Sequence, residues 1–313
     1  MTSTTAQGRD TAAVALPQRR PSVRPRRPGE SRTAPYLYLL PGLIAYTLFA
    51  IVPILHTGVL SFFDWDGLTA PVWVGIDNYT NLISDPVIQG ALIHSALYIV
   101  FFSFIPIVVG LILVTAMTRS RIRGIAAFRT VLFLPYTLAL VVVAVAWRWM
   151  FESTGSINSL LDLLGLGSLV RPWLGDFFWA LPAVGVMGAW AWYGLAMVLF
   201  LAGAQRIPRE LYDAARVDGA GVIREFFTVT LPGLRYEVSV TLTLTVIFAL
   251  RNFDLVWVTT KGGPGYATTT PALVMYQDAF QSGQVGLGAA LGVLITVVIL
   301  TVSIIIQRWF ERG

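Results

Sequence analysis

The 313-residue chain contains no cysteine, a single lysine and only two histidines. The absence of cysteine excludes disulfides, thiol catalysis and thiolate metal sites. The lysine, Lys261, precedes Gly262, so the Gly-x-x-x-x-Gly-Lys-Ser/Thr phosphate loop is missing. His56 and His94 stand apart in or near apolar segments, where a hydrogen bond is expected rather than a metal site with several ligands. We therefore expect the chain to bind no cofactor or metal and to be no enzyme.

Charge is also scarce, because only 12% of the residues are charged whereas 56% are hydrophobic. A soluble domain carries about twice that charged fraction. Six apolar segments each reach the roughly 20 residues that a helix needs to cross a bilayer. The composition therefore predicts an all-α integral membrane protein with six transmembrane helices, at residues 36–60, 91–117, 128–150, 179–202, 236–258 and 285–307.

Residues 1–33 contain four prolines and seven arginines and few large apolar side chains. Such a segment cannot bury enough apolar surface to fold, so we expect a disordered tail. The first apolar segment exceeds the length of a signal-peptide core, and no clear small-residue cleavage site follows it. We therefore expect a retained anchor and a permanent membrane domain over residues 34–313.

Most of the 22 basic residues lie in that tail, in residues 119–129, in residues 205–235 and at the C-terminus. Positively charged connections stay on the cytoplasmic side of a membrane. We therefore predict that both termini and residues 205–235 face the cytoplasm. The same distribution accounts for the net charge of +5, so no nucleic-acid partner is expected.

Residues 205–235 form the longest strongly charged stretch between two apolar segments, and their spacing predicts a short helix. Pro208 suits a first helical position, and Gly219 can adopt the left-handed conformation that ends a helix. Leu211, Ala214, Ala215 and Asp218 recur at helical spacing and share one face. Taken alone, this spacing favours a solvated connector in which Arg209, Asp213 and Arg216 pair locally.

Charged residues also occur near the outer end of the fifth apolar segment, where ionisable groups are costly. Arg251 and Asp254 are three residues apart, so they either form a local ion pair or offer hydrogen bonds to a substrate. In the second interpretation, Asn252 supplies further polar contacts to sugar hydroxyls, and Trp257 and Tyr276 supply stacking surfaces. The residues alone leave both interpretations open.

The six segments together with residues 205–235 resemble the membrane permease of a binding-protein-dependent ABC importer. That family's signature is Glu-Ala-Ala, three residues, Gly, nine residues, an aliphatic residue, one residue, and Leu-Pro. Here Asp213-Ala214-Ala215 occupies the triplet, Gly219 the glycine, Val229 the aliphatic position, and Leu231-Pro232 the end. The chain departs from the signature only by having Asp213 in place of glutamate. The resemblance implies a type I ABC importer permease fold.

Further stretches resemble carbohydrate permeases of the maltose-transporter type. They are Asn252-Phe-Asp-Leu-Val-Trp-Val-Thr-Thr-Lys-Gly-Gly-Pro-Gly265 with Tyr276 to Phe280, Val74-Gly-Ile-Asp-Asn-Tyr79, and Leu201-Ala-Gly-Ala-Gln-Arg-Ile-Pro208. Together the matches cover roughly residues 36–310. They imply an ATP-driven carbohydrate importer of the bacterial plasma membrane. Its other parts would be a second permease, an ATPase dimer that binds ATP and Mg, and an extracytoplasmic sugar-binding protein.

In that family the cytoplasmic helix docks in a cleft of the ATPase subunit. The resemblance implies that the alanine face is a docking surface, with Glu210, Asp213 and Asp218 as polar contacts and Gly219 ending the helix. Tyr212, Phe226 and Phe227 are either apolar anchors for the ATPase or packing under the membrane helices.

Two other classes of membrane protein remain as alternatives. An ion-gradient-driven secondary carrier would show internal repeats with broken helices at matching places. A membrane-embedded lipid or sugar transferase would need a cluster of carboxylates or histidines at the membrane surface. Neither feature is evident in the sequence.

Overall fold

The computed structural model describes residues 34–119 and 124–311. The predicted tail of residues 1–33 lies outside the described residues. The chain divides into two compact units, Met1–Val52 and Pro53–Gly313. The described part of the first unit is helical throughout, with α1 (Ala34–Tyr46), the π-helical turn η1 (Thr47–Ile51) and the first residue of α2 (Val52–Leu60).

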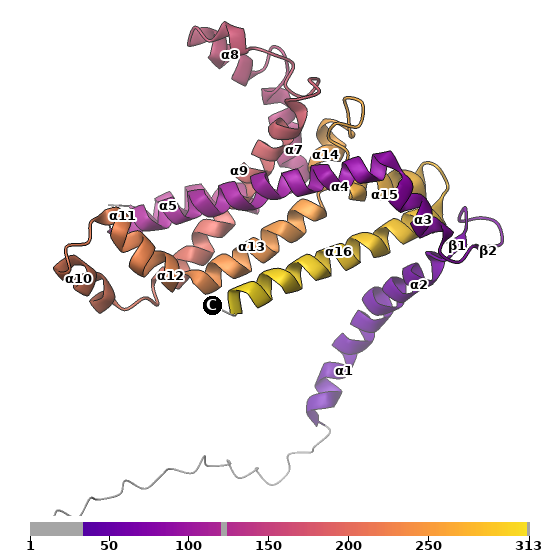
Figure 1. Ribbon diagram of the computed structural model, residues 1–313, viewed down its shortest axis with the longest axis horizontal. Helices are drawn as coiled ribbons and strands as arrows, with labels where there is room; N and C mark the ends of the chain where they lie inside the picture. The colour runs from indigo at the N-terminus through magenta and orange to yellow at the C-terminus, as the bar shows by residue number, and fades with distance from the viewer. Residues whose placement is uncertain (1–33, 120–123, 312–313) are drawn as a thin grey trace, which may run out of the picture. The chain divides into compact units, whose positions relative to one another are not determined.

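Two short strands and a series of helices make up the rest of the second unit (Figure 1). The first half consists of β1 (Phe63–Asp64), β2 (Val72–Trp73), α3 (Asp77–Ser84), α4 (Pro86–Ile99), η2 (Val100–Phe104), α5 (Ile105–Arg119), α6 (Ile125–Thr137), α7 (Leu140–Met150) and α8 (Ser156–Leu163). The second half consists of η3 (Gly167–Leu169), α9 (Ala180–Ala204), α10 (Arg209–Val217), α11 (Val222–Glu225), η4 (Phe226–Thr230), α12 (Leu231–Gly233), α13 (Arg235–Leu250), α14 (Asp254–Thr259), α15 (Pro271–Phe280) and α16 (Val285–Glu311).

Within the described residues, four helical stretches are long and apolar enough to cross a membrane, namely Tyr36–Leu60, Pro86–Thr118, Ala180–Ala204 and Val285–Glu311. Two bent helix pairs bring the number to six when each pair counts as one span. The predicted all-α membrane architecture is therefore confirmed. The second span begins five residues before the predicted start, because the Asp85 carboxylate caps the helix and Pro86 occupies its first turn.

The prediction of one continuous third helix over residues 128–150 is wrong. This segment consists of α6 and α7, which are bent by 94° at the extended residues Leu138 and Ala139. Pro135 lies in the last turn of α6 and has no N–H to donate to the preceding turn. The helix ends two residues after this proline, at Thr137.

The fifth predicted helix, residues 236–258, is likewise interrupted. α13 ends at Leu250, and α14 begins only at Asp254. The Thr270 hydroxyl donates a hydrogen bond of 2.7 Å to the Asn252 carbonyl, which the break leaves without a helical partner. This contact comes from 18 residues further along the chain, so local sequence patterns do not reveal it.

α9 and α13 hold the second unit together. α9 packs against α5, α6 and η2, and α13 packs against α4, η2 and α16 (Figure 1). Glycines allow close approach between α9 and η2, since a Cβ at Gly188 would overlap the buried Phe102 ring. At the other end of the unit, a Cβ at Gly286 would overlap the Phe63 carbonyl, so glycine lets β1 lie against α16.

Candidate coupling segment and substrate pathway

The helix predicted within residues 205–235 is present as α10, and Gly219 ends it as expected. Gly219 has a φ of 74°, and its N–H donates to the Arg216 carbonyl while the Ala220 N–H donates to the Ala215 carbonyl. This pair of bonds is the Schellman motif. Pro208 differs from the prediction, because its extended ψ of 135° makes it the residue before the helix rather than the first helical residue.

The predicted docking face of α10 is largely open. Leu211, Ala214 and Asp218 are exposed, and Ala215 is half-buried. Glu210 is also exposed, in the first turn of the helix, where the helix dipole favours a negative charge. The structure thus leaves these side chains accessible to a partner, and their role in docking remains a prediction.

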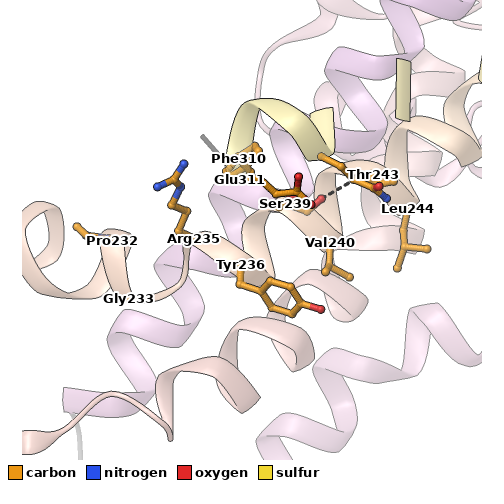
Figure 2. A pocket seen from close by; sticks show the side chains of 11 residues that line it. Pro232, Gly233, Arg235, Tyr236, Ser239, Val240, Thr243, Leu244, Phe310 and Glu311 are labelled. Atoms are coloured by element: carbon orange, nitrogen blue, oxygen red, sulfur yellow. Dashed lines mark hydrogen bonds between the residues drawn. The ribbon is translucent and has the colours of Figure 1, made fainter. Parts of the chain in front are cut away.

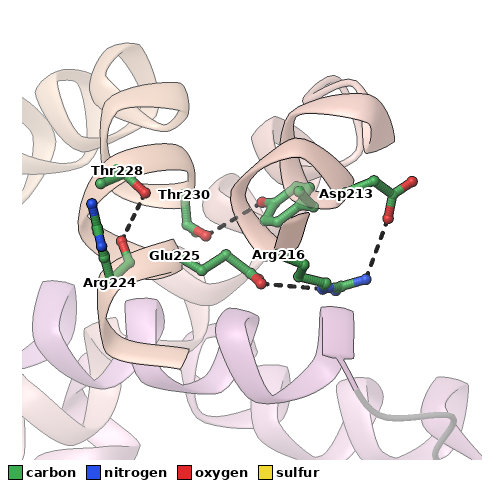
Figure 3. A network of polar contacts seen from close by, with 7 residues as sticks. Asp213, Arg216, Arg224, Glu225, Thr228 and Thr230 are labelled. Atoms are coloured by element: carbon green, nitrogen blue, oxygen red, sulfur yellow. Dashed lines mark hydrogen bonds and ion pairs between the residues drawn. The ribbon is translucent and has the colours of Figure 1, made fainter. Parts of the chain in front are cut away.

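Asp213 forms the local pair that its spacing predicted, because Arg216 Nη1 lies 3.4 Å from Asp213 Oδ1. The same guanidinium makes a second contact that sequence reasoning missed. Arg216 Nε lies 3.3 Å from Glu225 Oε2, and the Glu225 side chain is only 2% exposed (Figure 3). Arg216 therefore bridges an exposed carboxylate of α10 and a buried carboxylate of α11.

A second arginine joins the start of residues 205–235 to the membrane helix that follows them. Arg206, which follows α9, forms an ion pair with Glu237 in the first turn of α13. The Glu237 side chain is 8% exposed, and it lies where a Cβ on Gly203 would collide with it. Residues 205–235 are therefore tied at both ends to the membrane helices α9 and α13.

The three aromatic side chains of this segment have different surroundings. Phe226 packs beneath the membrane helices against the buried cluster that includes Leu234, whereas Phe227 is 60% exposed. The Tyr212 hydroxyl lies 3.3 Å from the Thr230 hydroxyl and so joins α10 to η4. The packing interpretation thus describes Phe226, and only Phe227 offers a largely exposed ring for an anchoring role.

Three of the five predicted pathway residues, Arg251, Asn252 and Asp254, lie at the break between α13 and α14. Arg251 is exposed at the end of α13, and Asp254 is half-buried in the first turn of α14. Within the described residues, no ion pair joins these two side chains. Asn252 is 6% exposed, and its side-chain nitrogen has no hydrogen-bond partner within the part of the chain that the structure describes. An unpaired buried donor costs about 1–3 kcal/mol.

Trp257 and Tyr276 are brought together, with ring centroids 5.0 Å apart. Phe253 stacks on Trp257 at 5.8 Å, and Phe280 lies 5.3 Å from Tyr276. Sequence reasoning singled out only the first two of these four rings. Phe253, at the break between α13 and α14, thus joins the rings of Trp257 and Tyr276 in one aromatic group, and it stands between Asn252 and Asp254 in the chain.

A further aromatic hollow lies at the bend between α6 and α7 and was not anticipated. This cavity of about 280 Å³ is lined by Pro135, Tyr136, Leu138, Leu140, Ala191, Trp192 and Phe248. Trp192 and Phe248 stack with their ring centroids 3.9 Å apart. The Trp192 indole N–H is buried and has no partner among the described residues, so it is a free donor beside two ring faces.

A larger cavity of about 690 Å³ lies beside the first half of α13, between that helix and the end of α16. Figure 2 shows Tyr236, Val240 and Leu244 projecting to one side of α13. None of the five predicted pathway residues lines this cavity. It lies next to residues 205–235, because Pro232 and Gly233 form part of its wall.

A polar cavity of about 430 Å³ separates α15 from α3 and the start of α4, and it contains two carboxylates. Burial, and then the neighbouring Asp85 carboxylate, raise the pKa of Asp278 above its ordinary value. A raised acid pKa means that the folded state favours the protonated carboxyl. Stability is therefore lost as the pH rises through the pKa of Asp278.

Replacing Asp278 by Asn is expected to raise the apparent melting temperature of the purified transporter at pH 7. The difference should vanish below about pH 4, where aspartate is protonated in the unfolded chain as well. Thermal unfolding at both pH values measures this, with Asp64→Asn on the exposed strand β1 as the matched control. Equal melting temperatures for Asp278→Asn and the parent at pH 7 would contradict the prediction.

Comparison with known proteins agrees with these features. The family described as "Binding-protein-dependent transport system inner membrane component" matches residues 95–313. The chain is 33% identical over 287 residues to the probable ABC transporter permease protein YurN of Bacillus subtilis (strain 168), covering 91% of this chain and 98% of YurN. It is 32% identical over 275 residues to the trehalose/maltose transport system permease protein MalF of Thermococcus litoralis, covering 86% of this chain and 91% of that protein.

Among solved structures, a chain of a bacterial ABC transporter involved in the import of the acidic polysaccharide alginate has the same fold. The TM-score is 0.75 at 23% identity, over 89% of this chain and 95% of that chain. His94 bonds the Thr269 carbonyl at 3.0 Å, as expected, and the described residues contain no group of three potential metal ligands. The family match and the nearly full-length relatives show that the chain belongs to the inner membrane components of binding-protein-dependent transport systems, the permeases of ABC importers.

Proposed function

We propose that the chain is a carbohydrate permease in which residues 205–235 join an ATPase to a sugar pathway along α13. As a permease subunit it is not an enzyme, and ATP hydrolysis takes place on a separate partner subunit. Family membership decides against the ion-gradient carrier and the transferase considered above. Carbohydrate cargo is supported by the names of relatives, which include permeases for trehalose and maltose, arabinooligosaccharides and diacetylchitobiose.

The observation that carries the coupling role is the way in which α10 is held. Its outer face is open, while Arg216 ties it to the buried Glu225 and Tyr212 ties it to Thr230. Both partners lie on the helical stretch that leads into α13 through a bend of 71°. A force applied to α10 by an ATPase therefore passes to a membrane helix through side-chain contacts as well as through the backbone.

The sugar pathway is supported by the groups that α13 and α14 bring together. Sugars present hydroxyl groups and flat apolar faces, which are recognised by placed polar groups and by aromatic side chains. Phe253, which stands between Asn252 and Asp254 in the chain, contacts the rings of Trp257 and Tyr276. One turn before Asn252, Phe248 stacks on Trp192 in the hollow, and the buried Trp192 N–H has no partner among the described residues.

The distribution of basic residues supports the proposed orientation. Arginines gather in residues 1–33, 119–129, 205–235 and at the C-terminus, so both termini and the coupling segment face the cytoplasm of a bacterial plasma membrane. ATP and Mg then bind to the partner ATPase on that side. A second permease and an extracytoplasmic sugar-binding protein complete the importer.

Reconstitution tests the proposed function directly. The permease is placed in liposomes with its genomically neighbouring second permease and ATPase, and with the neighbouring binding protein outside. Uptake of radiolabelled maltose, trehalose, arabinooligosaccharides and diacetylchitobiose is measured with ATP or ADP inside. We expect ATP-dependent uptake of at least one of these sugars. Uptake that proceeds equally with ADP and follows an ion gradient would refute the function.

Replacing Asp254 by Ala is expected to lower the initial rate of sugar uptake by about tenfold. The reason is that a hydrogen bond to a charged group is worth about 1.5–3 kcal/mol. Assembly with the ATPase should be unaffected, because the full length of α13 separates Asp254 from residues 205–235. Initial uptake rates and co-purification of the ATPase measure the two effects.

Two variants serve as controls for this experiment. Asp254→Asn keeps an acceptor oxygen at the same place and should retain more uptake than Asp254→Ala. Asp162→Ala removes an exposed carboxylate of α8 and should transport normally. Unchanged uptake kinetics in Asp254→Ala would remove this residue from the pathway.

A further inference from the structure

Arg216 contacts a residue outside α10 as well as one within it, and docking of α10 on an ATPase does not by itself require the outside contact. Its side chain is 56% exposed, and it reaches from α10 to α11. One guanidinium edge meets Asp213 at 3.4 Å, and Nε meets Glu225 at 3.3 Å (Figure 3). Arginine suits such a bridge because its planar group presents several donors in fixed directions.

The two carboxylates in this bridge differ in their surroundings. Asp213 has a side chain that is 70% exposed, so water screens its pairing, which by itself contributes little. Glu225 is 2% exposed, and a buried carboxylate is stable only when it is paired and hydrogen-bonded. The contact to Glu225 is therefore the less screened of the two, and it links the Arg216 side chain of α10 to α11.

The elements that follow α11 connect the Arg216–Glu225 contact to the membrane helix α13. Glu225 is followed directly by η4 and α12, and then by α13. The start of α13 is held to the end of α9 by Glu237 and Arg206. Any displacement of α10 thus acts through Arg216 on a segment that is continuous with the membrane helix beside the 690 Å³ cavity.

We infer that Arg216 is a positioning residue that makes α10 and the α11–α13 stretch move as one body. This inference rests on the proposed function, because it assigns the means by which the docking helix transmits ATPase movement. Asp213 then has a partner within the chain, at the exposed end of the Arg216 bridge. The bridge is a contact inside the permease and exists without the ATPase.

Spin labels test the inference without knowledge of the cargo. The chain has no cysteine, so Val217→Cys and Leu244→Cys give two unique labelling sites when the partner subunits are also cysteine-free. The distance between the labels is measured in the assembled transporter, with and without ATP and vanadate. The parent should show a narrow distance distribution, and the environment of the label at position 244 should respond to the nucleotide.

In Arg216→Gln the distance distribution should broaden. The nucleotide response at position 244 should fall at least about fivefold, the low end of typical coupling factors between sites, while ATP hydrolysis continues. Arg216→Lys keeps one charge without the planar fork, and should give an intermediate response. It replaces the glutamine variant if that variant fails to assemble. Arg224→Gln, a change of an exposed arginine in α11, should behave like the parent.

A double-mutant cycle separates the bridge from a general loss of packing. If Arg216 acts through Glu225, the double variant Arg216→Gln with Glu225→Gln should lose no more response than the worse single variant. Losses that multiply would overturn the inference, as would a normal nucleotide response in Arg216→Gln. If the parent itself shows no nucleotide response at position 244, the proposed coupling function fails instead.

Discussion

Transporters in which Glu210 and Asp213 are both replaced by Arg are expected to hydrolyse ATP without driving sugar uptake. Both carboxylates are exposed on α10, so the change reverses the charge of the proposed docking surface. Positive charge in the first turns of a helix is also disfavoured by the helix dipole. At position 213 the new arginine stands beside Arg216, so the bridge loses one of its carboxylates as well.

The measurement is the amount of sugar taken up per ATP hydrolysed in the same liposomes. We expect this ratio to fall by at least about fivefold, within the usual range of coupling between two sites. The control variant carries Asp64→Arg and Glu152→Arg, which make the same change in net charge at exposed positions outside residues 205–235. Parental uptake and an unchanged ratio in the Glu210 and Asp213 variant would exclude α10 as the docking element.

Replacing Gly188 by Val is expected to prevent assembly of a stable permease. Gly188 lies in α9 against the Phe102 ring, which is 2% exposed and so has no free space to move into. Overfilling a packed core costs about 1–3 kcal/mol or more, and this contact joins the central helix α9 to η2. The yield of folded protein after detergent extraction and size-exclusion chromatography measures the effect.

The matched control for this variant is Gly90→Val in α4. A Cβ at Gly90 meets no atom within 4 Å, although the change in helix propensity is the same. We therefore expect Gly90→Val to yield folded protein close to the parent. A stable, monodisperse Gly188→Val protein would show that α9 and η2 do not pack as closely as described.

Local rules were sufficient for much of this fold. The lengths of the first, fourth and sixth spans follow from apolar run length, and Gly219 follows from the need for a left-handed residue after α10. The Asp213–Arg216 pair follows from helical spacing alone. In each case the cause lies within a few residues of the effect.

Contacts between distant segments could not be predicted in this way. Glu225 lies in a charged stretch, where nothing in the local sequence indicates that its side chain is buried. The Asn252 carbonyl at the break after Leu250 is bonded by Thr270 from 18 residues away, and the Trp192 hollow lies at a bend in another helix pair. A free donor such as the Trp192 N–H becomes evident only when all its neighbours are placed.

Cysteine crosslinking tests directly whether α10 docks on the ATPase at the cytoplasmic side, and it is practicable because the parent chain contains no cysteine. Ala214→Cys, on the exposed face of α10, is combined with single cysteines in the ATPase cleft, and disulfide formation is followed in whole membranes. A membrane-impermeant thiol reagent is applied to each side separately. We predict a crosslink to the ATPase and labelling only from the cytoplasmic side. Labelling from the outer side together with no crosslink would show that α10 faces outward and does not dock on the ATPase.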